Sequence, residues 1–470
     1  MKKFQLIISS FLIFISQAFA QTDFQISLSN SFLGSTTKQL PFWLSANRDG
    51  KINPFVSLLN YSELSANVYS PVKTQNNLQY FAGVGVVGGL GNKNYLQLNR
   101  LFAGTAYKGW KIEAGMFYDS LRFDGLSTSN GNLARSRNAR PYPKVRLSTN
   151  SFKPIPFLKK WLSFSFEYDE GILNDERYIT RAHLHHKSFY LKTNRVAGFY
   201  LQAGIEHFVM WGGTSPDEII GDLPSDFNSY LYYISGSKGN SDFPQMDQNN
   251  IAGNQYGTYQ FLISKNFSEY SASINISHPF DDFSGLNWRN WPDNLIGLNI
   301  KRNKPDKFIN HILYEFTNTR QQSVVDSFYM WNDEAQLWKR MEDDNYFNHL
   351  IYISGATYHQ QAIGSPLFAP VIITDGISRG FESTRLFSHH LGIAGKVSSE
   401  IAWKSLFTYV QYLGTYRNPY QPFKEQLSFL FALNYKGSFI PFQLGISLAA
   451  DYGQMSENNM GIEVNISKSW

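Results

Sequence analysis

Charged side chains recur at alternate positions along several stretches of the chain, where they could bind charged ligands or pair with one another. Basic and acidic residues alternate from one stretch to the next, and opposite charges on adjacent strands stabilise their pairing. This wall is either a ladder of salt bridges that stiffens an interior or a polar surface that attracts an acidic solute. Its expected members are Lys111, Glu113, Lys144, Arg146, Glu167, Asp169, Arg181, His183, His185, Lys187, Gln202 and Glu206.

Two histidines of this set raise the question of a metal site. His183 and His185 lie on the same face of an expected strand. A zinc site needs further ligands, and no third ligand has a fixed spacing to this pair. We therefore predict no metal and no other cofactor. The chain has no cysteine, which excludes disulfides and thiolate ligands.

The sequence also lacks the catalytic motifs that would indicate an enzyme. The chain contains no Gly-x-Ser-x-Gly elbow, no His-Glu-x-x-His pair and no Gly-rich phosphate loop. We predict that the protein is not an enzyme. A hydrolase that uses a histidine, a serine and an acid is a separate hypothesis, with His185 and Glu206 as the residues to test.

The connection from Ser120 to Pro143 combines many short polar side chains with Arg135, Arg137 and Arg140. These groups make directional bonds to hydroxyls and carboxylates. The connection could therefore bind a ligand, or it could bond to itself and fold into the mouth of a barrel.

Alternating apolar and polar residues predict the elements that must position these groups. In Leu162–Asp169, for example, Leu162, Phe164 and Phe166 alternate with serines and acids. Many segments have about the 9–11 residues that a tilted membrane strand needs. We predict an all-β fold, a transmembrane antiparallel β-barrel of about 18 strands, although a soluble sandwich shows the same alternation. The expected strands are 24–34, 55–69, 78–88, 94–106, 109–119, 143–150, 160–170, 180–193, 197–209, 255–265, 268–278, 294–303, 309–318, 384–396, 399–413, 424–436, 440–451 and 459–470.

The connections divide into two groups. If the first strand runs outward, the inner turns are short, as in bacterial outer-membrane barrels, and the long extracellular loops lie at the other end. A short surface helix is expected within one of these loops, in Asp326–Asp344, because Trp331, Ala335, Trp338 and Met341 have helical spacing. The long loops are 35–54, 120–142, 210–254, 279–293 and 319–383.

Both ends of the chain favour export to the outer membrane. Lys2 and Lys3 precede an apolar run, and Ala18-Phe19-Ala20 matches a signal-peptide cleavage site. We predict cleavage after Ala20, which leaves residues 21–470 as a single barrel domain. The last strand ends on the aromatic Trp470, which resembles the closing strand that the barrel assembly machinery of the outer membrane reads.

Composition agrees with a barrel in the outer-membrane lipid. Aromatic residues make up 16% of the chain, as expected for girdles at two membrane interfaces. Beyond the leader, no apolar run reaches the roughly 18 residues of a membrane helix. Loss of Lys2 and Lys3 lowers the formal net charge from +5 to +3, which does not suggest a nucleic-acid partner.

Four sequence strings resemble the capsule assembly Wzi family in its Bacteroidetes-type form: Pro41–Leu44, Asn138–Arg146, His185–Tyr190 and Gly204–Gly213. The resemblance covers essentially the whole mature chain. It implies a closed eighteen-stranded barrel that acts as a lectin and holds capsular or extracellular polysaccharide at the cell surface. Proteobacterial members also carry an N-terminal periplasmic helical bundle, for which residues 21–54 are too short.

A lectin role directs attention to aromatic and cationic residues of the loops. Sugar C–H faces pack on aromatic rings, and acidic sugars form charge-assisted bonds with arginine. An outer-membrane porin or solute channel is the alternative function. The predicted polysaccharide ligands are Arg137, Asn138, Arg140, Trp211, Arg320, Trp331 and Trp338.

Overall fold

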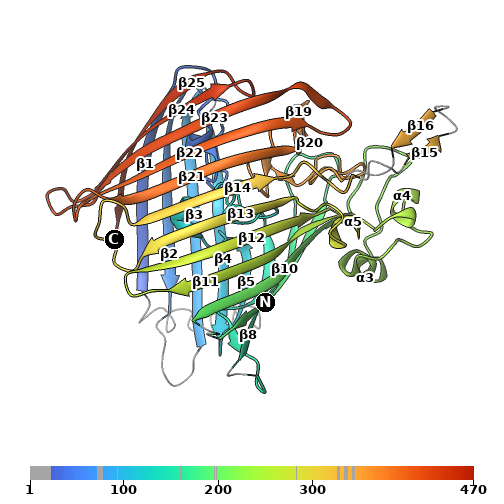
Figure 1. Ribbon diagram of the computed structural model, residues 1–470, viewed down its shortest axis with the longest axis horizontal. Helices are drawn as coiled ribbons and strands as arrows, with labels where there is room; N and C mark the ends of the chain where they lie inside the picture. The colour runs from blue at the N-terminus through green and yellow to red at the C-terminus, as the bar shows by residue number, and fades with distance from the viewer. Residues whose placement is uncertain are drawn as a thin grey trace, which may run out of the picture.

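The computed structural model describes residues 23–70, 78–92, 94–158, 161–194, 196, 198–281, 283–324, 329–332, 337–340 and 344–470 (Figure 1). The predicted leader and its cleavage site lie outside these residues. The division into a leader and one barrel domain therefore stays a prediction.

One antiparallel sheet forms the body of the protein and closes on itself. The first strand, β1, pairs with β2 on one side and with the last strand, β25, on the other. All eighteen predicted strands are present, so the predicted barrel is confirmed; a further strand, β7 (Lys153–Pro154), adds two residues beside β8. The wall strands are β1 (Asp23–Ser35), β2 (Leu58–Tyr69), β3 (Leu78–Gly91), β4 (Tyr95–Tyr107), β5 (Trp110–Met116), β6 (Lys144–Thr149), β8 (Leu162–Ile172), β9 (His183–Thr193), β10 (Phe199–Trp211), β11 (Asn254–Asn266), β12 (Tyr270–Phe280), β13 (Asn294–Arg302), β14 (His311–Asn318), β21 (Leu386–Lys396), β22 (Ile401–Gly414), β23 (Pro419–Tyr435), β24 (Gln443–Gly453) and β25 (Asn459–Ser469).

The two faces of the wall differ in chemistry. Residues that lie directly opposite each other in an antiparallel pair point to the same side. Ile274 is 43% exposed and lies on the outer face, whereas its neighbour Ser273 faces the lumen opposite Asn299. Apolar side chains outside and polar side chains inside are the arrangement that a lipid-embedded barrel requires.

The long connections all lie at one end of the barrel, as predicted. The chain ends lie at the opposite end, which we call the short-turn end and where every connection is short. The other end, the loop end, carries the long connections; α3, α4, α5 and the β15–β16 hairpin lie beyond it in Figure 1. Short connections such as 92–94 and 415–418 also occur at the loop end. The long connections are 36–57, 117–143, 212–253, 281–293 and 319–385.

Three loop segments, 36–57, 117–143 and 344–370, fold back over and into the lumen. Together they form what we call the plug. It contains α2 (Phe42–Ser45), the 3-10 turn η1 (Phe123–Gly125), β17 (Thr357–Tyr358) and β18 (Gln361–Ala362). One apolar core forms between the plug and the mid-lumen wall, where Trp43 and Leu126 meet Leu406 and Leu430. A second core at the loop end joins the 344–370 segment to wall residues such as Phe208.

The remaining loops carry α3 (Phe227–Ser235), α4 (Gln245–Asn249), α5 (Phe283–Leu286), and the paired strands β19 (Val371–Thr374) and β20 (Ile377–Phe381). Among the helices in the described part of the chain, none has the length and apolar character to cross a membrane.

The prediction of a helix within Asp326–Asp344 is wrong. Tyr329–Asn332 (β15) and Leu337–Arg340 (β16) form an antiparallel hairpin in which Trp331 and Trp338 are backbone partners. Aromatic residues favour strands, and here cross-strand pairing outweighs the helix propensity of the alanine, glutamate and glutamine between them.

Replacing Ile274 by lysine tests the outward face of the wall. A lysine near the middle of the lipid layer should lower the free energy of unfolding by about 2–4 kcal/mol. Equilibrium unfolding of the protein refolded into lipid vesicles measures this change. Ser273→Lys, at nearly the same depth but in the lumen, should lower the free energy of unfolding much less. Equal decreases for the two variants would contradict the assigned faces.

Candidate functional site

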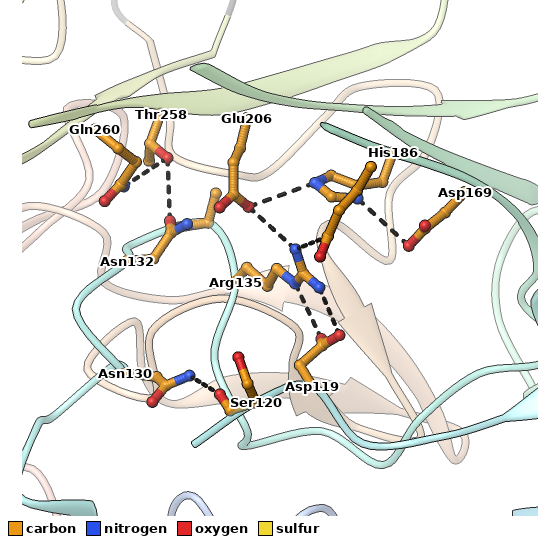
Figure 2. A network of polar contacts seen from close by, with 12 residues as sticks. Asp119, Ser120, Asn130, Asn132, Arg135, Asp169, His186, Glu206, Thr258 and Gln260 are labelled. Atoms are coloured by element: carbon orange, nitrogen blue, oxygen red, sulfur yellow. Dashed lines mark hydrogen bonds and ion pairs between the residues drawn. The ribbon is translucent and has the colours of Figure 1, made fainter. Parts of the chain in front are cut away.

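A buried ion-pair network joins the plug to the barrel wall. Arg135 lies at its centre, between Asp119 of the same loop and two acids of the wall (Figure 2). Its Nε lies 3.0 Å from Asp119 Oδ2, and one Nη lies 2.7 Å from Glu167 of β8 and 3.6 Å from Glu206 of β10. One arginine of the loop is therefore surrounded by three carboxylates.

The network continues along the wall. Arg146 of β6 donates two hydrogen bonds to the fully buried Asp169 of β8, at 2.7 and 2.6 Å. His186 of β9 bridges the two halves, with one ring nitrogen 3.4 Å from Asp169 and the other 3.4 Å from Glu206. Lys144 lies 3.8 Å from Asp169. These contacts match the salt-bridge interpretation of the charged wall, and they extend it to a loop.

A wall carboxylate anchors the middle of the plug. Glu315 of β14 accepts hydrogen bonds from the hydroxyls of Ser127 and Thr128 at 2.6 and 2.8 Å, and from the Thr128 backbone N–H at 2.8 Å. On the neighbouring strand, His390 donates to the Leu126 carbonyl at 2.6 Å. All of these residues are buried, so the loop exchanges its water contacts for wall contacts.

The first plug segment is fixed in the same manner. Arg48 pairs with Glu463 of β25, and Lys51 lies 3.0 Å from Glu63 of β2. Trp43 donates its indole N–H to Thr408 of β22 at 3.1 Å. The two plug segments also bind each other, because Arg137 donates to Asp49 at 2.7 Å.

At the loop end, a groove of about 180 Å³ remains between the plug and the β22–β24 wall. Phe55 lies in it with 54% of its surface exposed, beside Phe42 and Tyr412. Gln361 donates to the Ile52 carbonyl at 3.1 Å, while its Oε1 lies buried without a hydrogen-bond partner among the described residues. The groove therefore combines aromatic rings with amide groups.

The predicted polar wall is partly correct. Lys144, Arg146, Glu167 and Glu206 face the lumen and belong to the network. The register places His186, not His185, opposite Asp169. His186 was missed because a shift of one residue moves a side chain to the other face, and a single strand does not reveal its register.

The lumenal assignment of Arg181, His183 and His185 is wrong. His185 lies opposite Glu170 and bonds to it on the outer face, and His183 stacks on Trp211 at 4.5 Å between ring centroids. Arg181 precedes β9 and forms an exposed pair with Asp222. Lys187 shares the outer face of β9 and donates to the Ile234 carbonyl of α3.

This register also separates the two residues of the hydrolase hypothesis. Glu206 lies opposite Ser188 in the lumen, whereas His185 lies opposite Val209 on the outer face. The wall stands between them, so they cannot act on one substrate. Within the described residues, no group of three histidines or acids is arranged to hold a metal ion.

The predicted polysaccharide ligands do not form one cluster. Arg137 is held by Asp49 on the lumenal side of the plug. Asn138 is buried and donates to the Ala362 carbonyl, with an edge on the groove. Arg140 lies 5.9 Å from the centroid of the Tyr358 ring.

The other predicted ligands lie outside the lumen or have side chains that the structure does not describe. Trp211 packs on the outer face against Tyr230 and Tyr233 of α3. Arg320 lies at the outer rim, 5.2 Å from the Phe387 ring centroid. Trp331 and Trp338 belong to β15 and β16, whose side chains are outside the described set.

The 212–253 loop, which packs on the outer face beside Trp211, contains a buried acid. Asp247 of α4 accepts a bond from the Gly253 backbone N–H at 3.2 Å, and its Oδ1 has no hydrogen-bond partner among the described residues. Burial raises the pKa of Asp247 to about 6.

Comparison with known proteins identifies related chains. A family model for capsule assembly protein Wzi matches residues 45–372. Among solved structures, the chain is similar to Escherichia coli Wzi, an outer membrane protein involved in group 1 capsule assembly that is a carbohydrate-binding β-barrel. The two are 12% identical, the match covers 97% of this chain and 86% of the other, and the TM-score is 0.58.

The barrel is also similar to two Pseudomonas aeruginosa proteins. OccK5 (OpdH) is 8% identical, with 96% of this chain and 98% of the other covered and a TM-score of 0.50. OccK3 (OpdO) is 9% identical, with 97% of both chains covered and a TM-score of 0.50. These structural likenesses show the barrel fold. A search of curated protein sequences finds no match.

Arg135→Gln tests the ion-pair network. The change removes the cation that Asp119, Glu167 and Glu206 share, while Arg146 and His186 still contact them, so the free energy of unfolding should fall by about 1–3 kcal/mol. Denaturant unfolding in detergent or vesicles measures it. Arg181→Gln removes an exposed pair and should change stability by less than about 0.5 kcal/mol; equal effects of the two changes would contradict the network's structural role.

Asp247→Asn tests the buried acid. The folded pKa of about 6 exceeds the usual aspartate pKa of 3.8, so the stability of the loop falls as pH rises from about 4 to about 6 and stays low above that. At pH 7.5 the free energy of opening of the loop, measured by hydrogen exchange, should be up to about 3 kcal/mol higher in the variant than in the native protein. At pH 4 the difference should disappear. Asp242→Asn, an exposed change in the same loop, should show no such pH dependence.

Proposed function

Because the chain belongs to the capsule assembly protein Wzi family, we propose that it is an outer-membrane protein that binds capsular or extracellular polysaccharide at the cell surface. It holds the polymer there and supports capsule assembly or attachment, without turning it over. The loop end faces outward, in keeping with the orientation of outer-membrane barrels.

The observation that carries this proposal is the filled mouth of the barrel. Buried bonds from Arg135, Glu315 and Glu463 hold the plug against the wall. A plug fixed at several wall strands is poorly suited to an open diffusion channel. It is well suited to a binding protein, because rigid loops lose little conformational entropy when a ligand is bound.

The groove at the loop end offers the chemistry that a glycan needs. The exposed ring of Phe55 can pack on the C–H face of a sugar. Gln360, Gln361 and Ser456 line the same recess, and their amide and hydroxyl groups can exchange hydrogen bonds with sugar hydroxyls.

Phe55→Ala tests the groove. Loss of the ring should weaken binding of the organism's own purified capsular polysaccharide by about 5–10-fold, in line with about 1–1.5 kcal/mol for an aromatic contact. Surface plasmon resonance on the detergent-purified protein measures the affinity. Phe439→Ala, at the short-turn end, removes an equally apolar ring that is 91% exposed and should leave the affinity unchanged.

The same two variants can be compared in cells in which the native gene is deleted. Phe55→Ala should release more polysaccharide into the medium than Phe439→Ala does. Unchanged retention in the deletion strain would contradict the proposed function. Large, stable single-channel openings of the native protein in a planar bilayer would favour the channel alternative instead.

A further inference from the structure

Beneath the plug, the lumen holds two adjoining cavities, which we call the lumenal chamber. The larger is about 340 Å³ and the smaller about 190 Å³. Both are lined by Arg122 and Asn130 of the plug, so these two residues mark the place where the cavities meet. The chamber is separate from the groove at the loop end, with which it shares only Ala46 among its lining residues.

The chamber lies toward the short-turn end. Asp124, one of its lining residues, contacts Lys301 and His311, which flank the short connection 303–310. Lys404 lies four positions into β22, just after the short turn 397–400. Leu121 lies on the same side of the plug and is 55% exposed although the barrel surrounds it. Solvent therefore reaches the chamber from the short-turn end.

The larger cavity of the chamber has an excess of positive charge, whereas the smaller one is lined by three acids and two cations: Asp119, Glu167, Glu206, Arg122 and Arg135. The larger cavity is lined by five cations and two acids: Arg48, Lys51, Arg122, Arg137, Lys404, Asp49 and Asp124. Arg48, Lys51 and Arg137 are paired with carboxylates. Among the described residues, neither Lys404 nor the Arg122 guanidinium has a hydrogen bond or ion pair, and the Arg122 guanidinium lies 5.2 Å from the centroid of the Phe123 ring.

The surroundings of Lys404 make the positive charge of its ammonium group energetically unfavourable. Its direct neighbours on the wall are Ala394 and Ala432, which offer no polar group. Leu406 and Leu430 line the cavity nearby, together with Trp43. A cation recessed among apolar side chains is poorly solvated, so an anion bound against it gains a strong charge-assisted contact.

The rest of the lining fits a sugar. Trp43 and Tyr61 of the larger cavity and Tyr190 of the smaller one provide rings. Amide groups are supplied by Asn47, Asn130, Asn132 and Gln202. Rings, amides and unpaired cations together are the groups that recognise a sugar with a carboxylate.

We propose that the lumenal chamber binds a carboxylate-bearing sugar that enters from the short-turn end, with Lys404 and Arg122 as the groups that hold the carboxylate. This site lies on the opposite side of the plug from the groove at the loop end. It does not depend on the proposed surface function, because neither Phe55 nor Gln361 lines it.

Isothermal titration calorimetry on the full-length, detergent-purified protein tests the site with trigalacturonate, maltotriose and inorganic phosphate. Trigalacturonate should bind, and Lys404→Met and Arg122→Gln should each weaken it about tenfold, as expected for loss of a charge-assisted contact. Lys436→Met, an exposed change at the short-turn end, and Phe55→Ala should leave it unchanged.

Three results would overturn the proposal: no binding of trigalacturonate, equal binding of maltotriose, or phosphate bound as tightly as trigalacturonate. The last would assign the cations to phosphate groups. A second measurement needs no variant. Trigalacturonate should slow the reaction of Lys404 with an amine-acylating reagent in the native protein, while Lys436 reacts at the same rate as before; an unslowed Lys404 would also overturn the site.

Discussion

The pairing of buried charge between plug and wall is the constraint on which the structure depends. A polar loop can lie inside a barrel only when its hydrogen-bonding and charged groups find partners there. Arg135 finds three carboxylates, and Glu315 receives three hydrogen bonds from Ser127 and Thr128. Because these partners come from strands on different sides of the wall, the loop also ties the wall together across the lumen.

The plug gives the barrel two unlike ends. Toward the loop end it leaves a groove with rings and amides, beside loops that are bonded to one another. Toward the short-turn end it leaves a chamber whose larger cavity is lined by more cations than acids. One wall therefore carries two recesses whose chemistry is set separately, since few residues contribute to both.

The outer face near the loop end is more polar than a lipid-facing surface requires. His183, His185 and Lys187 lie there, and the 212–253 loop covers them through Tyr230 and the Ile234 carbonyl, while Trp211 of β10 stacks on His183. The loop satisfies groups that lipid could not, because hydrocarbon offers no hydrogen-bond partner. Because the loop covers its outer face, β9 can carry polar residues on both faces at this end.

The sequence by itself determined the strands, their number and the closed barrel, because period-two alternation is a local property that each strand carries alone. It also indicated the family, through the resemblance of four short sequence strings. It also identified Lys144, Arg146, Glu167 and Glu206 as lumenal. Only the tertiary structure decided which histidine of 183–186 faces inward, because the face depends on register with Asp169 and Glu206 on neighbouring strands. It likewise decided that the 117–143 loop fills the lumen: its partners, such as Glu315, lie almost two hundred positions away in the chain, and no local pattern records a contact over that distance.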